Sequence, residues 1–269
     1  MQTMATPFST RYDAASGAKK GFARKANVSD SSVIRLCRTL GYSGFLDLQN
    51  DIQGQMLQHI EDGTDTLLSP IQKLNEKTSG FKKSDIITTH LNYSIANLQS
   101  VIEKNTSEKF DAIASILVQS RQKFISGFRG CRGLADWTAL ILGHMLPNVR
   151  RNTSAGSDVL EALLDLSAND CVLVISFHRY AHAAIDTVTF AKSKGAKVVV
   201  ITDKLTSPVA SGADQVVIVD VQGLSFFNSL VAASFAVELI LGAVNKAIGT
   251  SNHDRLSVLD AYVSLHGFY

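Results

Sequence analysis

Short apolar runs separated by helical stretches constrain the fold more than any other feature of this chain. The runs are "KFISGF" (123–128), "CVLVISF" (171–177), "AKVVVIT" (196–202) and "DQVVIVD" (214–220), with "NVRRN" (148–152) as a weaker fifth. Helical patterns lie between or after them, at about 131–146, 157–167, 180–194 and 226–248. Strands that alternate with helices predict βαβ units and a parallel sheet. We therefore predict a fold of the α/β class, with a doubly wound parallel sheet and helices on both faces.

Two further helical segments flank this predicted domain. Residues 84–105 carry apolar side chains at helical spacing, and so does the amphipathic segment 255–266. With the 226–248 helix, they offer more hydrophobic surface than one α/β sheet can cover. We therefore expect a homo-oligomer, either a dimer or a tetramer.

The positive charge of the chain is concentrated at its amino-terminal end. Residues 1–45 hold seven Lys and Arg against two Asp, a net charge of +5, whereas the whole chain carries +2. A basic end on a near-neutral body suggests a polyanion partner for that end. A solvated basic tail is the alternative, and charge alone does not separate the two.

Spacing within this basic end predicts a helix-turn-helix. Small and apolar residues recur at the positions that two crossing helices bury, namely Ala23, Ala26, Val28, Val33 and Leu36. Asn27 suits the left-handed turn between the helices. Ser29 is a suitable N-cap for a second helix, Asp30 to Leu40, which Gly41 ends.

The second helix of this pair has a polar face suited to a DNA major groove. If Val33, Leu36, Cys37 and Leu40 face inward, hydroxyl residues and arginines face outward, and arginine makes bidentate contacts with guanine. An ordinary helical hairpin with a polar face is the alternative. The residues expected to contact DNA are Lys25, Ser29, Ser31, Ser32, Arg35, Arg38 and Thr39.

The stretch "NVSDSSVIRLCRTLGYSGFLDLQ" (27–49) resembles the signature of RpiR/MurR-type bacterial transcriptional regulators, in which it ends the DNA-binding domain. The resemblance extends over nearly the whole chain from Phe22 onward. It implies that the α/β body is a SIS (sugar isomerase) domain, and "ITDKLTSPVASGADQVVIV" (201–219) matches a SIS segment of the family. The partners it implies are a double-stranded DNA operator and a small-molecule effector.

The resemblance also places an effector at two loops that follow predicted strands. The loop from Gly127 to Arg132 lies where relatives carry Gly-x-Arg-Ser-Ser or Gly-x-Gly-x-Ser. The loop from Ser176 to His182 lies where sugar-phosphate binders carry Ser-x-Ser-Gly-x-Thr, whose hydroxyls and amides cradle the phosphate. Only Ser176 survives of those three hydroxyls, because His178, Arg179 and Ala181 replace the second Ser, the Gly and the Thr.

Arginines in these loops still suit an anion. We expect a small anionic effector that contacts Arg129, Gly130, Cys131, Arg132, Ser176, His178, Arg179, Tyr180 and His182. Alternatively, Arg129 and Arg132 pair with Asp136 or with a partner subunit. Trp137 and the leucine-rich helix around it are expected to lie in the core.

These features favour a DNA-binding regulator that senses a small anionic metabolite, with a phosphosugar as one candidate. The alternatives are a sugar-phosphate isomerase, in which Glu161 or His182 would act as the base, and a binding module that has lost its DNA function. We expect no catalytic residue and no cofactor. We also expect no metal, because His178 and His182 lack a third ligand. Three scattered cysteines and the lack of an apolar run near ~18 residues favour a cytoplasmic protein that does not span a membrane.

The predicted organisation has four parts. Residues 1–60 form the helix-turn-helix domain, 61–107 a linker and connecting helix, 108–250 the SIS domain and 251–269 a C-terminal helix. Residues 1–21 offer few large apolar groups and are interrupted by Pro7 and Gly17. Burying so little surface does not offset an ordering cost of roughly 1–2 kcal/mol per residue. We therefore expect 1–21 to be disordered, the head to lack its first helices, and DNA binding to be weakened.

Overall fold

The chain divides into two units, Met1–Leu68 and Ser69–Tyr269. The structure is a computed structural model that describes residues 29–39, 43–45, 71, 85–154 and 158–266. The predictions for residues 1–21, for the first helix of the helix-turn-helix and for Lys25 therefore lie outside the described residues.

In the first unit, helix α3 (Asp30–Thr39) begins where the sequence predicts. The Ser29 hydroxyl accepts a hydrogen bond from the Ser32 amide at 3.2 Å, which confirms Ser29 as the N-cap. Val33 and Cys37 are buried, as expected, and Phe45 is buried as well. Leu36 was expected inside, but its side chain is 49% exposed. It lies beside the stripe that Val33 and Cys37 form one helical turn apart, and therefore at the margin of the buried face.

The second unit contains the predicted parallel sheet. Its strands are β1 (Lys123–Gly127), β2 (Val149–Asn152), β3 (Cys171–Ile175), β4 (Lys197–Thr202) and β5 (Gln215–Ile218). All pairings are parallel, in the order β2-β1-β3-β4-β5. Every residue of β1 and β3 is buried, which explains why the strands appear in the sequence as nearly continuous apolar runs. The weak candidate strand at 148–152 is confirmed as β2.

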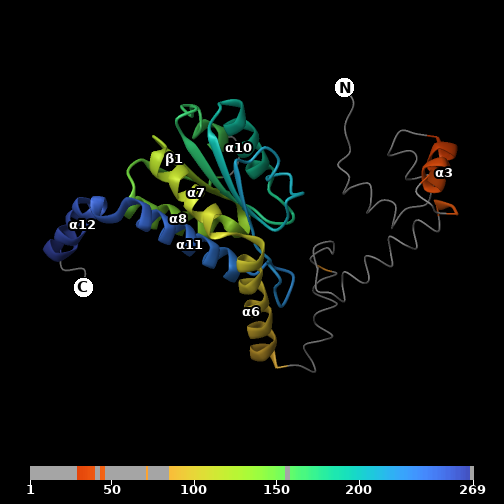
Figure 1. The fold of residues 1–269 in the computed structure, drawn as a ribbon, viewed down its shortest axis with the longest axis horizontal. Helices are drawn as coiled ribbons and strands as arrows, with labels where there is room; N and C mark the ends of the chain where they lie inside the picture. The colour runs from red at the N-terminus through yellow and green to blue at the C-terminus, as the bar shows by residue number, and fades with distance from the viewer. Residues whose placement is uncertain (1–28, 40–42, 46–70, 72–84, 155–157, 267–269) are drawn as a thin grey trace. The chain divides into compact units, whose positions relative to one another are not determined.

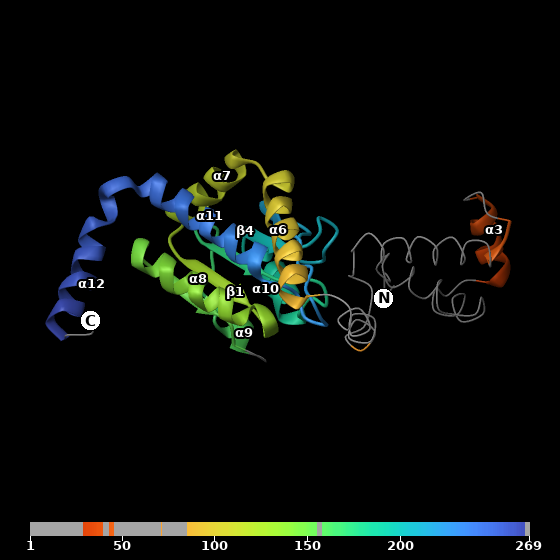
Figure 2. The ribbon, with the colours of Figure 1, turned by 90° about the horizontal axis from the view of Figure 1, so that it is seen from below.

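Helices cover both faces of the sheet (Figures 1 and 2), as predicted. One apolar cluster joins the sheet to α9 (Asp158–Glu161) and α10 (His182–Ser193). The larger cluster joins the other face to α7 (Ser107–Gln119), α8 (Arg132–Met145) and α11 (Val231–Ile248). Helix α12 (His253–His266) follows a short 3-10 turn and extends away from the sheet in both views.

Three helices differ from the sequence-based prediction. Helix α7 was not predicted, although Phe110, Ile113, Ala114 and Leu117 are buried at helical spacing. The helix expected at 157–167 is only α9, because i to i+3 turns follow it, such as the Leu163 amide to the Leu160 carbonyl. The helix expected from 226 begins at Val231, after a loop that lies beside the functional site.

Trp137 was expected in the core, but its side chain is 39% exposed. Leu134, Thr138 and Leu142 form the buried face of α8, and Trp137 lies outside that face.

Helix α11 has 18 residues and a mean hydropathy of 1.6. By length and composition alone it could cross a membrane. Eight of its residues, from Ala232 to Val244, are buried within this domain. It therefore packs here as a core helix against α7 and the sheet.

Hydrogen bonds to Asp170 join the residues just before β1 to those just before β3. Asp170 is fully buried, and its carboxylate accepts two bonds from the Arg121 guanidinium, at 2.9 and 2.8 Å. Further bonds come from the Ser167 amide and hydroxyl and from the Gln122 amide. Burial alone would raise the pKa of Asp170, but these donors together lower the pKa to about 2.

This depressed pKa predicts acid-dependent stability. An unfolded aspartate has a pKa of about 3.9. The stabilisation from Asp170 should therefore be complete above pH ~4 and disappear as the pH falls towards ~2. In urea unfolding from pH 7 to pH 2, Asp170→Asn should lose most stability at neutral pH and approach wild type in acid. Asp186→Asn, at an exposed position on α10, is the control; a pH-independent deficit in Asp170→Asn would contradict the prediction.

Candidate functional site

A hollow lies where the sheet topology changes direction. The chain passes from β1 to β2 on one side and from β3 to β4 on the other, and open α/β sheets place ligands at such a point. The hollow has a volume of about 370 Å³. It is lined by Phe128, Arg129, Gly130, Cys131, Ser176, Phe177, His178, Arg179, Ala181, Phe226, Phe227, Asn228 and Leu230.

The first loop leaves β1 through a tight turn that requires glycine. A Cβ atom on Gly127 would lie 2.6 Å from the Ala135 side chain and 2.8 Å from the Cys131 carbonyl oxygen. The chain then forms a 3-10 turn, Arg129–Cys131, and continues into α8. This close approach of loop and helix places Arg129, Gly130 and Cys131 at the hollow.

Two arginines at the hollow have left-handed backbone conformations. Arg129 has φ 55° and Arg179 has φ 65°. Such a conformation costs a residue other than glycine roughly 1–2 kcal/mol. Arg179 stands where phosphosugar binders carry glycine, and Arg129 stands at the second glycine of Gly-x-Gly-x-Ser. Both positions therefore have a backbone conformation that favours glycine, and both carry a guanidinium group.

Hydrogen bonds hold the second loop at its first residue, Ser176, and at Arg179. The buried Ser176 donates its amide to the Ile201 carbonyl at 3.1 Å, which extends the pairing of β3 with β4. The Arg179 guanidinium donates to the Phe226 carbonyl at 3.0 Å, from the loop between β5 and α11. Arg179 therefore bridges two of the three segments that line the hollow.

Three of the predicted effector residues do not line the hollow. The Tyr180 hydroxyl donates to Asp203 at 2.8 Å, and burial, with the Asp203 charge, raises its pKa. Arg132 pairs with Asp136 at 3.6 Å, the alternative considered from the sequence. His182 is exposed at the start of α10.

The loop between β5 and α11 contributes residues that the sequence analysis did not predict. Phe226, Phe227, Asn228 and Leu230 line the hollow, and the two phenylalanine rings meet edge to face with centroids 5.7 Å apart. Both rings are about half exposed, at 47% and 53%. Gly223 and the polar residues Ser225, Asn228 and Ser229 are signals of a loop. They could have separated this segment from the helix.

The hollow combines two arginines with a lining that is otherwise largely apolar. Burial raises the pKa of the Cys131 thiol to about 11, so the thiol is neutral near pH 7. Among the described residues, no three His, Cys, Asp or Glu side chains come together as a metal site would require.

The polar face predicted for the recognition helix is exposed in α3. Ser29, Ser31, Ser32, Arg35, Arg38 and Thr39 are all exposed. At its amino-terminal end, the Ser29 hydroxyl lies 2.8 Å from the Ser31 hydroxyl and 2.9 Å from the Ser32 hydroxyl. Three hydroxyls and a helix start, followed by two arginines, form a surface suited to a DNA backbone and base edges.

The strain at Arg129 can be measured by substitution. Because glycine adopts a positive φ without steric cost, Arg129→Gly should be more stable than Arg129→Ala by about 1 kcal/mol. Arg132, with φ −57°, is the matched control, and there the glycine variant should be the less stable one. Urea unfolding of the four variants tests both signs. An Arg129→Ala protein as stable as Arg129→Gly would mean that the loop is not strained.

Two family models match the chain. The model of the helix-turn-helix domain of the rpiR family matches residues 12–59, and the SIS domain model matches residues 116–243. A Haemophilus influenzae protein named as an uncharacterized HTH-type transcriptional regulator is 22% identical over 73% of this chain and 66% of its own length. The Bacillus subtilis regulator YbbH is 24% identical over 70% of this chain and 63% of its own length. The chain thus spans slightly less than two thirds of either relative.

Solved structures support the fold. The sugar isomerase domain of an RpiR transcription factor from Sphaerobacter thermophilus matches with a TM-score of 0.62 and 19% identity, over 66% of this chain and 99% of that chain. The Vibrio vulnificus NanR protein, solved with ManNAc-6P, matches with a TM-score of 0.56 and 17% identity, over 94% of this chain and 87% of that chain. The resemblance inferred from the sequence is confirmed: this chain carries a helix-turn-helix domain of the rpiR family, followed by a SIS domain.

Proposed function

We propose that this protein is a DNA-binding transcriptional regulator whose SIS domain senses a small anionic metabolite. One combination of observations carries the proposal. An exposed hydroxyl and arginine face lies on the predicted recognition helix, and a hollow lined by two arginines lies at the switch point of the sheet. The relatives named as HTH-type transcriptional regulators support it.

On DNA, the face of α3 provides groups for two different tasks. The hydroxyls of Ser31 and Ser32, at the amino-terminal end of the helix, suit phosphate oxygens, which position a protein on the duplex. Arg35 and Arg38 lie one and two turns further along and suit the base edges of guanine. Ser29 and Thr39 remain proposed contacts of the same surface. Lys25 remains a proposed DNA contact, and it lies outside the described residues.

The effector is proposed to be a phosphosugar or a metabolite of similar charge. Arg129 and Arg179 supply positive charge, and His178 and Ser176 supply hydrogen-bonding groups. The Phe226 and Phe227 rings provide an apolar wall for the uncharged part of a ligand. The complex of Vibrio vulnificus NanR with ManNAc-6P shows that a protein of this fold holds a phosphosugar.

We propose that the hollow does not catalyse isomerisation. Isomerisation beside a carbonyl requires a positioned base. The described lining residues include no carboxylate, and the two candidate bases, Glu161 and His182, are exposed outside the hollow. Steady turnover of a sugar phosphate by the purified protein would overturn this part of the proposal.

The working form is proposed to be a cytoplasmic homodimer, since two operator half-sites require a symmetric pair. Helix α6 (Ile86–Lys104) supports this, because it exposes a row of large aliphatic side chains, Ile87, Leu91, Ile95 and Ile102. A monomeric sedimentation profile at micromolar concentration would contradict it.

The DNA contact is tested at Arg35. Removal of a base-contacting arginine should reduce the difference in binding free energy between selected and random DNA by ~1–3 kcal/mol. Fluorescence titrations of the full chain with fragments selected from genomic DNA would measure that difference. Arg150→Ala, at an exposed arginine of β2, is the control and should bind like wild type. An unchanged sequence preference in Arg35→Ala would remove α3 as the recognition helix.

The effector site is tested at Arg179. Loss of a charge-assisted hydrogen bond should weaken the binding of ManNAc-6P or inorganic phosphate by roughly tenfold to a hundredfold. Arg132→Ala is the matched control, because Arg132 pairs with Asp136 and does not line the hollow. Calorimetric titration of both variants decides the matter. Equal affinities of wild type and Arg179→Ala would place the site elsewhere.

A further inference from the structure

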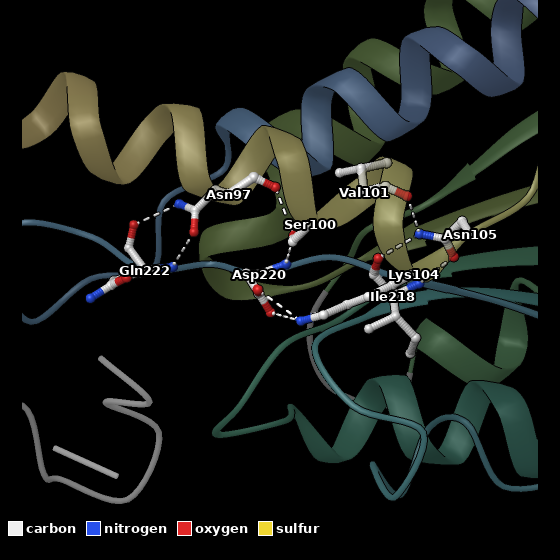
Figure 3. A network of polar contacts seen from close by, with 8 residues as sticks. All are labelled: Asn97, Ser100, Val101, Lys104, Asn105, Ile218, Asp220 and Gln222. Atoms are coloured by element: carbon white, nitrogen blue, oxygen red, sulfur yellow. Dashed lines mark hydrogen bonds and ion pairs between the residues drawn. The ribbon is translucent and has the colours of Figure 1, made fainter. Parts of the chain in front are cut away.

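Side chains at α6 form hydrogen bonds with backbone groups at Ile218, the last residue of β5, and at Asp220 and Gln222 beyond it (Figure 3). Strand β5 is the edge strand, and its extended chain continues to Gln222. Asn97 donates to the Gln222 carbonyl at 2.8 Å and accepts from the Gln222 amide at 3.2 Å. Asn105 does the same for Ile218, at 2.7 and 3.0 Å. Between them, the Ser100 hydroxyl accepts from the Asp220 amide at 3.1 Å.

The spacing of these contacts matches the two elements. The eight steps from Asn97 to Asn105, the C-cap of α6, correspond to a rise of about 12 Å along a helix. The four steps from Ile218 to Gln222 correspond to about 13 Å along an extended chain. Each asparagine therefore meets one residue of the edge as a neighbouring strand would. Because Asn97 and Asn105 are buried, a shift of α6 along the edge would leave backbone groups unpaired, so helix and edge move together.

The same edge continues directly into the wall of the hollow. Gln222 lies in the loop from Val221 to Leu230, which the Ser229 amide closes by donating to the Val221 carbonyl at 3.0 Å. The loop is compact, because a Cβ atom on Gly223 would lie 2.5 Å from the Phe227 carbonyl oxygen. A displacement at Phe226 or Phe227 therefore reaches Gln222 through close backbone contacts.

At the hollow, the loop is held by a group that also suits the effector. The Arg179 guanidinium donates to the Phe226 carbonyl at 3.0 Å. An anion in the hollow would compete for this guanidinium, and a charged acceptor forms the stronger hydrogen bond. The anion-free and anion-bound states would then differ in one contact of Arg179. Its guanidinium would hold the loop in the first state and the anion in the second.

We propose that the loop from Val221 to Leu230 couples anion binding at Arg179 to helix α6 through the Asn97–Gln222 contact. This inference rests on the anion site of the proposed function. Helix α6 is the first helix described after the amino-terminal unit along the chain. Among the described elements of the second unit, α6 is therefore the one nearest in sequence to the helix-turn-helix domain. The coupling requires no catalytic step, because one hydrogen-bond acceptor replaces another.

Hydrogen exchange of the full chain, with inorganic phosphate as the probe and potassium chloride at matched ionic strength as the reference, tests the coupling. In wild type, phosphate should protect the loops at 127–132 and 176–182. The amides of Asp220 and Gln222 should exchange several-fold faster, because the loop loses its contact with Arg179.

The matched variants lie on the same helix. Asn97→Asp removes the donor to the Gln222 carbonyl and sets a carboxylate oxygen against that carbonyl oxygen, so the contact between α6 and Gln222 should open. Its hollow should still gain protection from phosphate, whereas Gln222 should exchange fast in both conditions. Asn92→Asp makes the same charge change at an exposed position of α6 and should respond like wild type.

The outcomes separate this inference from the proposed function. Protection of the hollow without faster exchange at residues 218–222 would overturn the coupling and leave the anion site standing. A wild-type response in Asn97→Asp would do the same. No protection at saturating phosphate would overturn the anion site, and the coupling with it. DNA binding does not enter the measurement, so a failure of the predicted DNA contact would not alter the result.

Discussion

The free edge of β5 is the constraint on which the arrangement of the SIS domain depends. An edge strand has unpaired backbone groups that must find partners or attract other strands. Here the partners are the buried asparagines of α6, and the chain between α6 and β5 must fold so that these groups meet. The ion pair between Lys104 and Asp220, at 2.6 Å, adds an exposed contact to the same edge. Because the chain continues from this edge into the loop from Val221 to Leu230, these contacts also fix where the third wall of the hollow begins.

Most of the sheet could be predicted from the sequence because its strands are buried on both faces. A strand such as "CVLVI" appears in the sequence as an apolar run, and four such runs with intervening helices leave few alternative topologies. Boundaries and helix faces were harder, as Trp137, Leu36 and the late start of α11 illustrate. Each depends on which neighbour covers a residue, and local spacing does not contain that information. Helix α7 is different, because its buried spacing was present in the sequence and was overlooked.

The candidate site was predictable in part, because its two loops follow strands at a known point of the topology. Arg129, Cys131, Ser176, His178 and Arg179 could be named from those loops and do line the hollow. The third wall could not be predicted, because Phe226 and Phe227 reach the hollow only after β5 and the compact turn at Gly223 bring them there. Tyr180 and Arg132 belong to the same loops but are held by Asp203 and Asp136. Sequence position alone cannot assign such a pairing.

The two strained arginines indicate how such a site can change its ligand chemistry without changing its fold. A glycine-rich loop binds anions with backbone amides, which are directed by a left-handed turn. Arg129 and Arg179 have left-handed backbone conformations although neither residue is glycine. Contacts with the surrounding residues must therefore maintain this backbone geometry. Gly127 and the pairing of Ser176 with β4 provide that support. Arg129 and Arg179 thus bring positive charge to loops that lack most of the hydroxyls that relatives carry there. The Arg179 guanidinium also holds the Phe226 carbonyl, which a glycine at that position has no side chain to do.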